Sequence, residues 1–198
     1  MLTAKAYIIK LFYPVALVYW KYWSKLYQFL YHRKYKNTKL PQGLTLIQAQ
    51  EKMHAIAWTK DSVRELWDSC SSPRWVQHVI NEIFAGNPQP RGSLDCDDFS
   101  IWALNTVSKN FFPRIFMFTW LDYKGKLHGH AMCLTRNKDG NLVHIGNWGI
   151  SRPYRNLREA CIDILKTYHS DKPIGWALLN KDLSITRWGR NLPEDNIK

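Results

Sequence analysis

The sequence predicts an α+β domain in which helices pack on an antiparallel sheet, with a separate aromatic and basic helix ahead of it. Apolar residues recur at helical spacing up to residue 108, and alternating segments separated by glycine-containing turns follow between residues 114 and 149. Helices first and sheet afterwards is typical of the α+β class. A chain of 198 residues, 45% of them hydrophobic, can build one such core. We therefore expect an N-terminal element over residues 1–40 and a globular domain over residues 41–198.

Residues 1–40 differ in composition from the rest of the chain. The stretch YIIKLFYPVALVYWKYWSKLYQFLYHRKYK is crowded with aromatic and basic residues, and residues 1–40 contain no acidic residue. The uncharged run Leu11–Trp20 is shorter than the ~18 to 20 apolar residues of a membrane-spanning helix, and no signal-peptide cleavage site follows it. Aromatic rings among lysines suit a helix lying on an anionic membrane surface, and such a helix could be deleted without loss of the domain. The alternative is a helix docked on its own domain or on a partner.

Three helices are predicted next. Residues 44–57 place apolar side chains roughly on one helical face. In SSPRWVQHVINEIFAG, Ser72 can cap a helix, Pro73 fits its first turn and Gly86 can end it. The buried stripe of this helix is expected to contain Trp75, Val76, Val79, Ile80 and Phe84. A third helix is predicted over residues 95–108.

A meander of strands is predicted after the helices. RIFMFTWLDY (114–123), KLHGHAMCLTR (126–136) and NLVHIGNWG (141–149) are separated by the turns KGK and KDGN. Residues 156–169 return to helical spacing, and residues 174–180 predict a last strand.

Charge and cysteine content limit the partners and the compartment. The net charge of +12 and the pI near 9.6 favour an anionic partner, such as lipid headgroups, nucleic acid, a cell wall or an acidic protein. The four cysteines lie far apart without a C-x-x-C pair, so neither a zinc ribbon nor a redox pair is indicated. A reducing compartment such as the cytoplasm is the simpler expectation.

Cys96 stands among Asp95, Asp97 and Asp98 at the start of the helix predicted over residues 95–108. A cysteine attacks as thiolate, and its ordinary pKa of about 8.5 is lowered by a helix N-terminus, a cation or an imidazolium. The adjacent carboxylates oppose this effect, because negative charge near sulfur disfavours the thiolate. A catalytic Cys96 would therefore need an imidazolium partner.

The strand predicted over residues 126–136 supplies two histidines. Alternation puts His128 and His130 on one face and Cys133 on the other. His130 lies in mid-strand and is the preferred base, held against the helix, with His128 as the alternative. Asn147 on the adjoining strand can accept the imidazole N–H. Cysteine at a helix start, histidine on one strand and asparagine on the next is the order required for acyl transfer by a thiol.

Three segments, LDCDDFSIWAL, HGHAMCLTR and LVHIGNWG, resemble the transglutaminase-like cysteine proteinases, particularly the bacterial group with a D-C-[DE]-D-[FY] helix start. The resemblance covers residues 92–149. It implies a papain/transglutaminase-like core and the triad Cys96, His130 and Asn147, with asparagine where the family has aspartate. The NWG segment is similar to papain-like enzymes, in which an asparagine followed closely by Trp-Gly orients the histidine.

The aspartates beside Cys96 have two interpretations. In one, Asp95, Asp97 and Asp98 supply an N-cap and complement the helix dipole. In the other, which the family resemblance suggests, Asp95 and Asp97 hold calcium and need at least three more oxygen ligands. No other cofactor is expected. An oxyanion hole would use the Cys96 backbone N–H and one donor from the preceding loop, for which Gln89 is a candidate.

We therefore expect a cysteine-dependent amide hydrolase that forms a thioester on a protein or peptide substrate, while nucleic acid is not the expected partner. It would act in the cytoplasm, peripherally at a membrane if residues 1–40 bind one. Two alternatives remain open. The basic charge suits a peptidoglycan-directed amidase or phage-borne cell-wall enzyme. Asn147 and the opposing aspartates suit a non-catalytic binding or virion structural protein that retains the fold.

Overall fold

The computed structural model describes residues 7, 10–59, 70–90, 94–146 and 149–195. Its described helices are α2 (Tyr13–His32), α3 (Leu46–His54), α4 (Pro73–Phe84), α5 (Cys96–Thr106) and α6 (Leu157–Thr167), with short 3-10 turns over Arg33–Tyr35 and Lys109–Phe111. The strands are β1 (Arg114–Leu121), β2 (Leu127–Arg136), β3 (Leu142–Gly146), β4 (Gly149–Ile150), β5 (Lys172–Leu179) and β6 (Ile185–Arg190). They form one antiparallel sheet in the order β4-β3-β2-β1-β5-β6, which confirms the α+β class.

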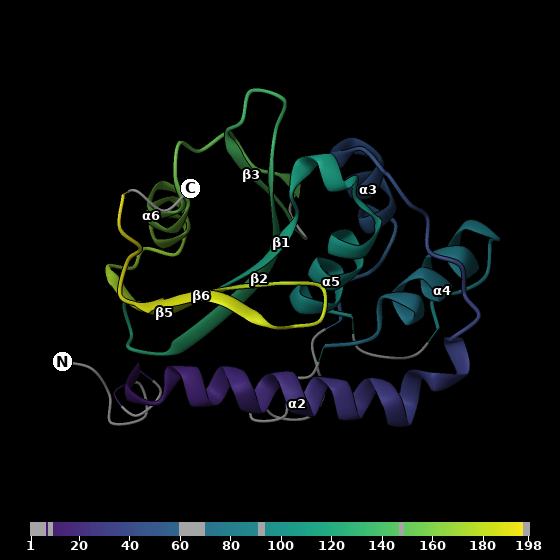
Figure 1. The fold of residues 1–198 in the computed structure, drawn as a ribbon, viewed down its shortest axis with the longest axis horizontal. Helices are drawn as coiled ribbons and strands as arrows, with labels where there is room; N and C mark the ends of the chain where they lie inside the picture. The colour runs from purple at the N-terminus through teal and green to yellow at the C-terminus, as the bar shows by residue number, and fades with distance from the viewer. Residues whose placement is uncertain (1–6, 8–9, 60–69, 91–93, 147–148, 196–198) are drawn as a thin grey trace.

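The sheet separates two hydrophobic layers. Figure 1 shows α6 on one side of the sheet and α3, α4 and α5 on the other, with α2 along the base of the molecule. Side chains alternate along β2, so Cys133 enters the core shared with α5 while Met132 enters the core shared with α6. This alternation decides which strand residues lie near each helix.

Helix α2 docks on its own domain. Tyr13, Leu17 and Trp20 are buried in the same core as α5, and a Cβ on Gly175 would lie 2.9 Å from the Tyr13 ring. This burial raises the pKa of Tyr13 to about 12. The expectation that this segment could be removed without loss therefore conflicts with its packing. Among the described residues, no helix has the length and apolar character needed to cross a membrane.

The predicted cap of α4 is confirmed, because Ser72 Oγ accepts a hydrogen bond from the Trp75 N–H at 3.2 Å and Pro73 begins the helix. Phe84, expected in the buried stripe, is instead 62% exposed at the end of the helix. Ile47 is likewise 64% exposed, because α3 turns Ala49, Gln50 and Met53 inward. In both helices, an apolar residue at helical spacing is largely exposed because no other element of the described structure buries it.

The strands predicted over residues 114–123 and 126–136 are confirmed as β1 and β2, and the predicted last strand is β5. Of the strand predicted over residues 141–149, β3 covers Leu142–Gly146, Gly149 belongs to β4, and residues 147–148 lie outside the described residues. Strands β4 and β6 were not predicted. β6 is an edge strand whose side chains are mostly exposed, so it lacks the apolar alternation that marks a strand in sequence.

Candidate active site at Cys96

Cys96 is the first residue of α5, and its side chain is partly exposed. The helix begins here because Asp95 adopts an extended N-cap conformation and its backbone N–H donates to Asp98 Oδ2 at 3.1 Å. Cys96 therefore lies where the unsatisfied N–H groups of the helix favour negative charge.

The sulfur of Cys96 lies at the edge of β2. Its Sγ accepts a contact from the Ala131 N–H at 3.5 Å. Strand β3 pairs with β2 only from Cys133 onward, so at Ala131 this edge of β2 lacks a described strand partner. The thiol thus accepts from the Ala131 N–H in the position where a backbone carbonyl of a neighbouring strand would accept in a continuous sheet. Because Ala131 follows His130, the His130 Cα is at most about 6 Å from the sulfur by backbone geometry.

His130 projects from the opposite face of the sheet to the one covered by α5. Its cross-strand partner Phe118 belongs to the core shared with α6, and partners in register point to the same face. The expectation that His130 is held against the helix of Cys96 is therefore wrong. The sulfur contacts the backbone beside His130, at the edge of β2 beyond the end of β3, and the imidazole projects to the other face.

The imidazole of His130 is buried beside Gly146, since a Cβ on Gly146 would lie 3.7 Å from His130 Nε2. Burial lowers the pKa of His130 to about 3, with a further lowering from His144. The ring is therefore neutral at pH 7 and is not the imidazolium partner that we expected, and a pKa this far below neutrality makes it a weak proton acceptor. Asn147 follows Gly146 in the chain and lies outside the described residues, so its role as the third member stays a prediction.

His128, the alternative base, is held elsewhere. Its Nε2 lies 2.9 Å from Asp122 Oδ2 in the turn between β1 and β2, and its ring stacks on Trp120. This hydrogen bond is the largest cause of the lowered pKa of Asp122. The arrangement gives His128 a structural partner and favours His130 as the base.

The three aspartates beside Cys96 are buried and have backbone partners at the start of α5. Asp98 accepts from the Ser71 N–H as well as from Asp95 N, and Asp97 Oδ1 accepts from the Asp98 N–H at 3.1 Å. Ligand atoms of Asp95, Cys96 and Asp97 lie within 4.8 Å of one another. Two carboxylates and a thiol do not match the six to eight oxygens that calcium takes. The contacts favour a structural role, and calcium at Asp95 and Asp97 stays a prediction.

The structure changes the roles assigned to two glutamines, Gln89 and Gln50. The Gln89 amide is bound at both ends by Ala57, with Nε2 donating to its C=O at 3.0 Å and Oε1 accepting from its N–H at 2.8 Å. Gln89 therefore holds a loop and is not available as the expected oxyanion donor. Gln50, which we did not single out, is buried and donates to Gly146 O at 3.2 Å, so it supports the backbone beside His130. No spacing in the sequence marked it.

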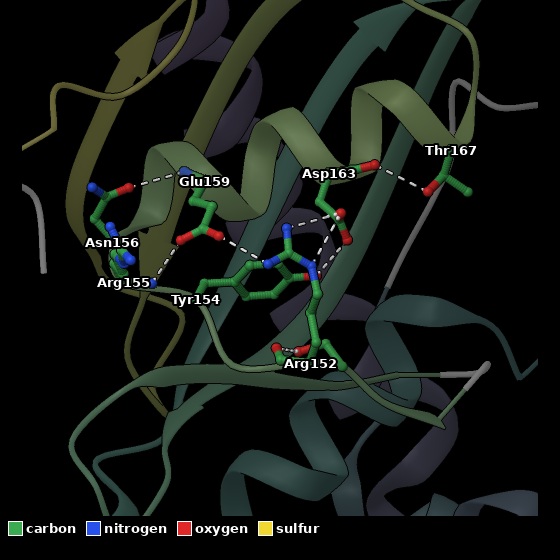
Figure 2. Close-up of polar contacts among 8 residues, drawn as sticks. Arg152, Tyr154, Arg155, Asn156, Glu159, Asp163 and Thr167 are labelled. Carbon is green, nitrogen blue, oxygen red and sulfur yellow. Dashed lines mark hydrogen bonds and ion pairs between the residues drawn. The ribbon is translucent and has the colours of Figure 1, made fainter.

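The segment after β4 is fixed to α6 by a polar network (Figure 2). Arg152 makes ion pairs with Glu159 at 2.8 Å and Asp163 at 3.1 Å, and the Tyr154 hydroxyl donates to Asp163 at 2.7 Å. The Tyr154 ring stacks on His144 of β3. The strands on both sides of residues 147–148 are thereby anchored to a helix.

Comparison with known proteins gives no match: no family model, curated protein or solved structure shows significant similarity to this chain.

Proposed function

We propose that the protein is a cysteine-dependent amide hydrolase with a papain/transglutaminase-like core, in which Cys96 is the nucleophile, His130 the base and Asn147 the residue that orients His130. One observation carries the proposal. Cys96 Sγ lies at a helix N-terminus and 3.5 Å from the backbone N of the residue that follows His130. A thiol and a neutral imidazole at the edge of one strand are the two groups that acyl transfer needs.

The reaction begins from a neutral pair. Buried His130 is uncharged at pH 7, and the carboxylates near Cys96 disfavour a resting thiolate. His130 therefore takes the thiol proton as the sulfur attacks the carbonyl carbon, and the Cys96 backbone N–H at the start of α5 stabilises the oxyanion. The amide C–N bond then breaks, the amine leaves with the proton from His130, and a thioester remains. Water, deprotonated by His130, hydrolyses the thioester to a carboxylic acid and the free thiol.

The test is labelling of the folded protein with iodoacetamide, followed by mapping of the modified cysteine by mass spectrometry. Cys70, Cys133 and Cys161 are buried internal controls, and burial raises the pKa of Cys133 to about 12. We expect Cys96 to be modified faster in the native chain than in His130→Ala, because His130 takes the thiol proton, and the other three cysteines to remain unmodified. Equal modification of Cys96 in the native chain and in His130→Ala would favour the non-catalytic alternative. Release of labelled peptidoglycan fragments would identify the cell-wall amidase.

A second function, docking on an anionic bilayer, is favoured by the outward face of α2. One face of this helix packs on the domain. The rest of α2 and the two residues before it expose large apolar side chains: Leu11, Phe12, Val15, Val18, Tyr19, Tyr22, Leu26, Phe29, Leu30 and Tyr31. Residues 1–40 carry basic and no acidic side chains. An apolar face flanked by lysines matches an anionic lipid surface in both polarity and charge.

Sedimentation of the full chain with phosphatidylserine/phosphatidylcholine vesicles tests this docking. We expect binding that weakens as salt is added, because each basic residue near the surface contributes about 1 kcal/mol and salt screens this attraction. The part of the binding that comes from inserted apolar side chains should remain at high salt. The double variant Tyr22→Ser/Phe29→Ser should lose sedimentation. Phe84→Ser/Tyr123→Ser removes two aromatic residues of similar exposure outside α2 and should retain it. Equal sedimentation of both variants would refute docking through α2.

A further inference from the structure

A cavity of about 340 Å³ opens on the α6 side of the sheet, at the other end of β2 from the Cys96 contact. Its apolar wall contains Leu134, Leu142, Leu157, Leu178 and Phe112. Three arginines, Arg114, Arg136 and Arg187, also line it. The volume lies in the range of small-molecule sites, which begins at roughly 300 Å³.

The three arginines come from three different strands and point the same way. Arg114 pairs with Leu134, Arg136 with Leu142 and Arg187 with Leu178. Residues that pair across an antiparallel sheet project from the same face. These leucines belong to the core under α6 or pack against it, so all three guanidinium groups rise from that face. The sheet therefore brings three arginine side chains, of which Arg114 and Arg187 are exposed and Arg136 is half-buried, to one apolar floor.

The described residues do not balance these three charges with ion pairs. Within the described part of the chain, no carboxylate lies within 4.0 Å of Arg114, Arg136 or Arg187. Arg114 donates to Pro113 O at 2.9 Å and Arg136 to Gly140 O at 2.7 Å, and each guanidinium has further N–H groups. By contrast, Arg152 on the same side of the sheet is neutralised by two carboxylates.

A second cavity of about 390 Å³ shares Phe112 and Arg114 with the first and extends the positive charge. It adds Lys109 and Lys181. Burial lowers the pKa of Lys181, and the charge of Lys109 lowers it further, so the two ammonium groups repel each other. Asp182 also lines this cavity and keeps its negative charge while it accepts hydrogen bonds from Ser184, so the wall holds three basic residues and one acidic residue. Clustered like charges destabilise a fold unless an anion offsets them.

We propose that the arginine-lined cavity binds a small amphiphilic anion, namely a phosphate monoester or carboxylate carried on a short hydrocarbon body. The leucine floor takes the apolar body, and the arginine fork binds planar or tetrahedral oxyanions with two parallel N–H groups. The hydrocarbon floor distinguishes this ligand from inorganic phosphate, and the concave shape distinguishes it from a nucleic-acid backbone. The inference does not depend on the chemistry at Cys96.

Calorimetric titration of the full chain with octyl phosphate tests the proposal, with inorganic phosphate and octanol as probes of charge alone and chain alone. We expect octyl phosphate to bind and the two comparison probes to bind at least tenfold more weakly. Arg114→Gln and Arg136→Gln should each weaken octyl phosphate about tenfold, the value of one lost charge-assisted hydrogen-bonded pair. The matched control Arg74→Gln removes an exposed arginine on α4 and should bind as the native chain does.

Four outcomes would overturn the proposal. Octyl phosphate fails to bind, or it binds equally to Arg114→Gln, Arg136→Gln and the control. Inorganic phosphate binds as tightly as octyl phosphate, which would show that the leucine floor takes no part. A short DNA duplex binds more tightly and loses affinity in the same two variants, which would make the surface a polyanion site. Leu178→Gln gives an independent reading, because it should weaken octyl phosphate while leaving the arginines in place.

Discussion

The Cys70 backbone N–H donates a hydrogen bond of 3.0 Å to Ser24 Oγ, and both residues are fully buried. Gln28, one helical turn further along α2, donates to Cys70 O at 3.0 Å. The neighbouring Ser71 N–H donates to the carboxylate of Asp98. The same carboxylate accepts from the backbone N–H of Asp95, the N-cap residue of α5. Helix α2 is thus connected through residues 70–71 to the start of α5, where Cys96 lies.

Ser24→Ala should destabilise the protein, because it leaves the buried Cys70 N–H without its acceptor. The expected loss is about 1 to 3 kcal/mol of unfolding free energy. Urea unfolding of the variant measures it, and Lys25→Ala, an exposed neighbour on the same helix, is the matched control. Equal midpoints for the two variants would show that this hydrogen bond does not stabilise the fold.

Deleting residues 1–40 should unfold the chain and abolish any activity. The composition of this segment instead predicts that it could be removed without loss of the domain. The deletion removes Tyr13, Leu17 and Trp20 from the core and Ser24 from Cys70. Circular dichroism of the truncated chain is the measurement. If the truncated chain folds cooperatively and is active, residues 1–40 are a separable segment, as their composition predicts.

Cys96→Ala should abolish amide hydrolysis while the fold persists, because the side chain is small and only partly buried. His130→Ala should be about as severe, and His128→Ala much milder, since His128 is held by Asp122. Turnover of each variant on a generic peptide substrate, with its unfolding midpoint, provides the comparison. Unchanged turnover of Cys96→Ala would exclude the hydrolase, and a reversed order of the histidines would assign the base to His128.

Asn147 should support the reaction without being essential. An amide can accept the imidazole N–H, but it stabilises a transient imidazolium less than a carboxylate does. Asn147→Ala is therefore expected to lose part of the rate, and Asn147→Asp to retain or raise it. An aspartate variant as inactive as Cys96→Ala would show that Asn147 is not the third member of the triad.

Stability should fall on acidification through the buried histidines. Burial lowers the pKa of His32, His130 and His144 to about 4, 3 and 4, below the ordinary value of about 6.5 in the unfolded chain. Between those values the unfolded state binds more protons, so unfolding free energy rises with pH up to about 6.5 and is then flat for these groups.

His144→Phe isolates one of these sites, because it keeps an aromatic ring against Tyr154 and removes the titration. The slope of unfolding free energy between pH 4.5 and 6 should decrease by up to about one proton. His54→Phe, on the exposed side of α3, is the control. A slope unchanged in His144→Phe would mean that His144 is already protonated in the folded state.

Local signals in the sequence determined much of this protein. The cap at Ser72 followed by Pro73, the turns at KGK and KDGN and the alternation in residues 126–136 predicted α4 and the central strands, because each depends on neighbours in the chain. The same alternation correctly separated His130 from Cys133. Helical spacing over residues 95–108 placed Cys96 at the start of a helix.

Only the tertiary structure decided how these elements meet. Alternation fixes which strand residues share a face, but not which face a helix covers. His130 therefore lies on the α6 side, while the next residue, Ala131, contacts the Cys96 sulfur through its backbone N–H. The docking of α2, the contact of Gln50 with Gly146 and the convergence of Arg114, Arg136 and Arg187 join residues far apart in the chain. Such contacts arise from the register of the sheet and the closure of the core, which no local segment encodes alone.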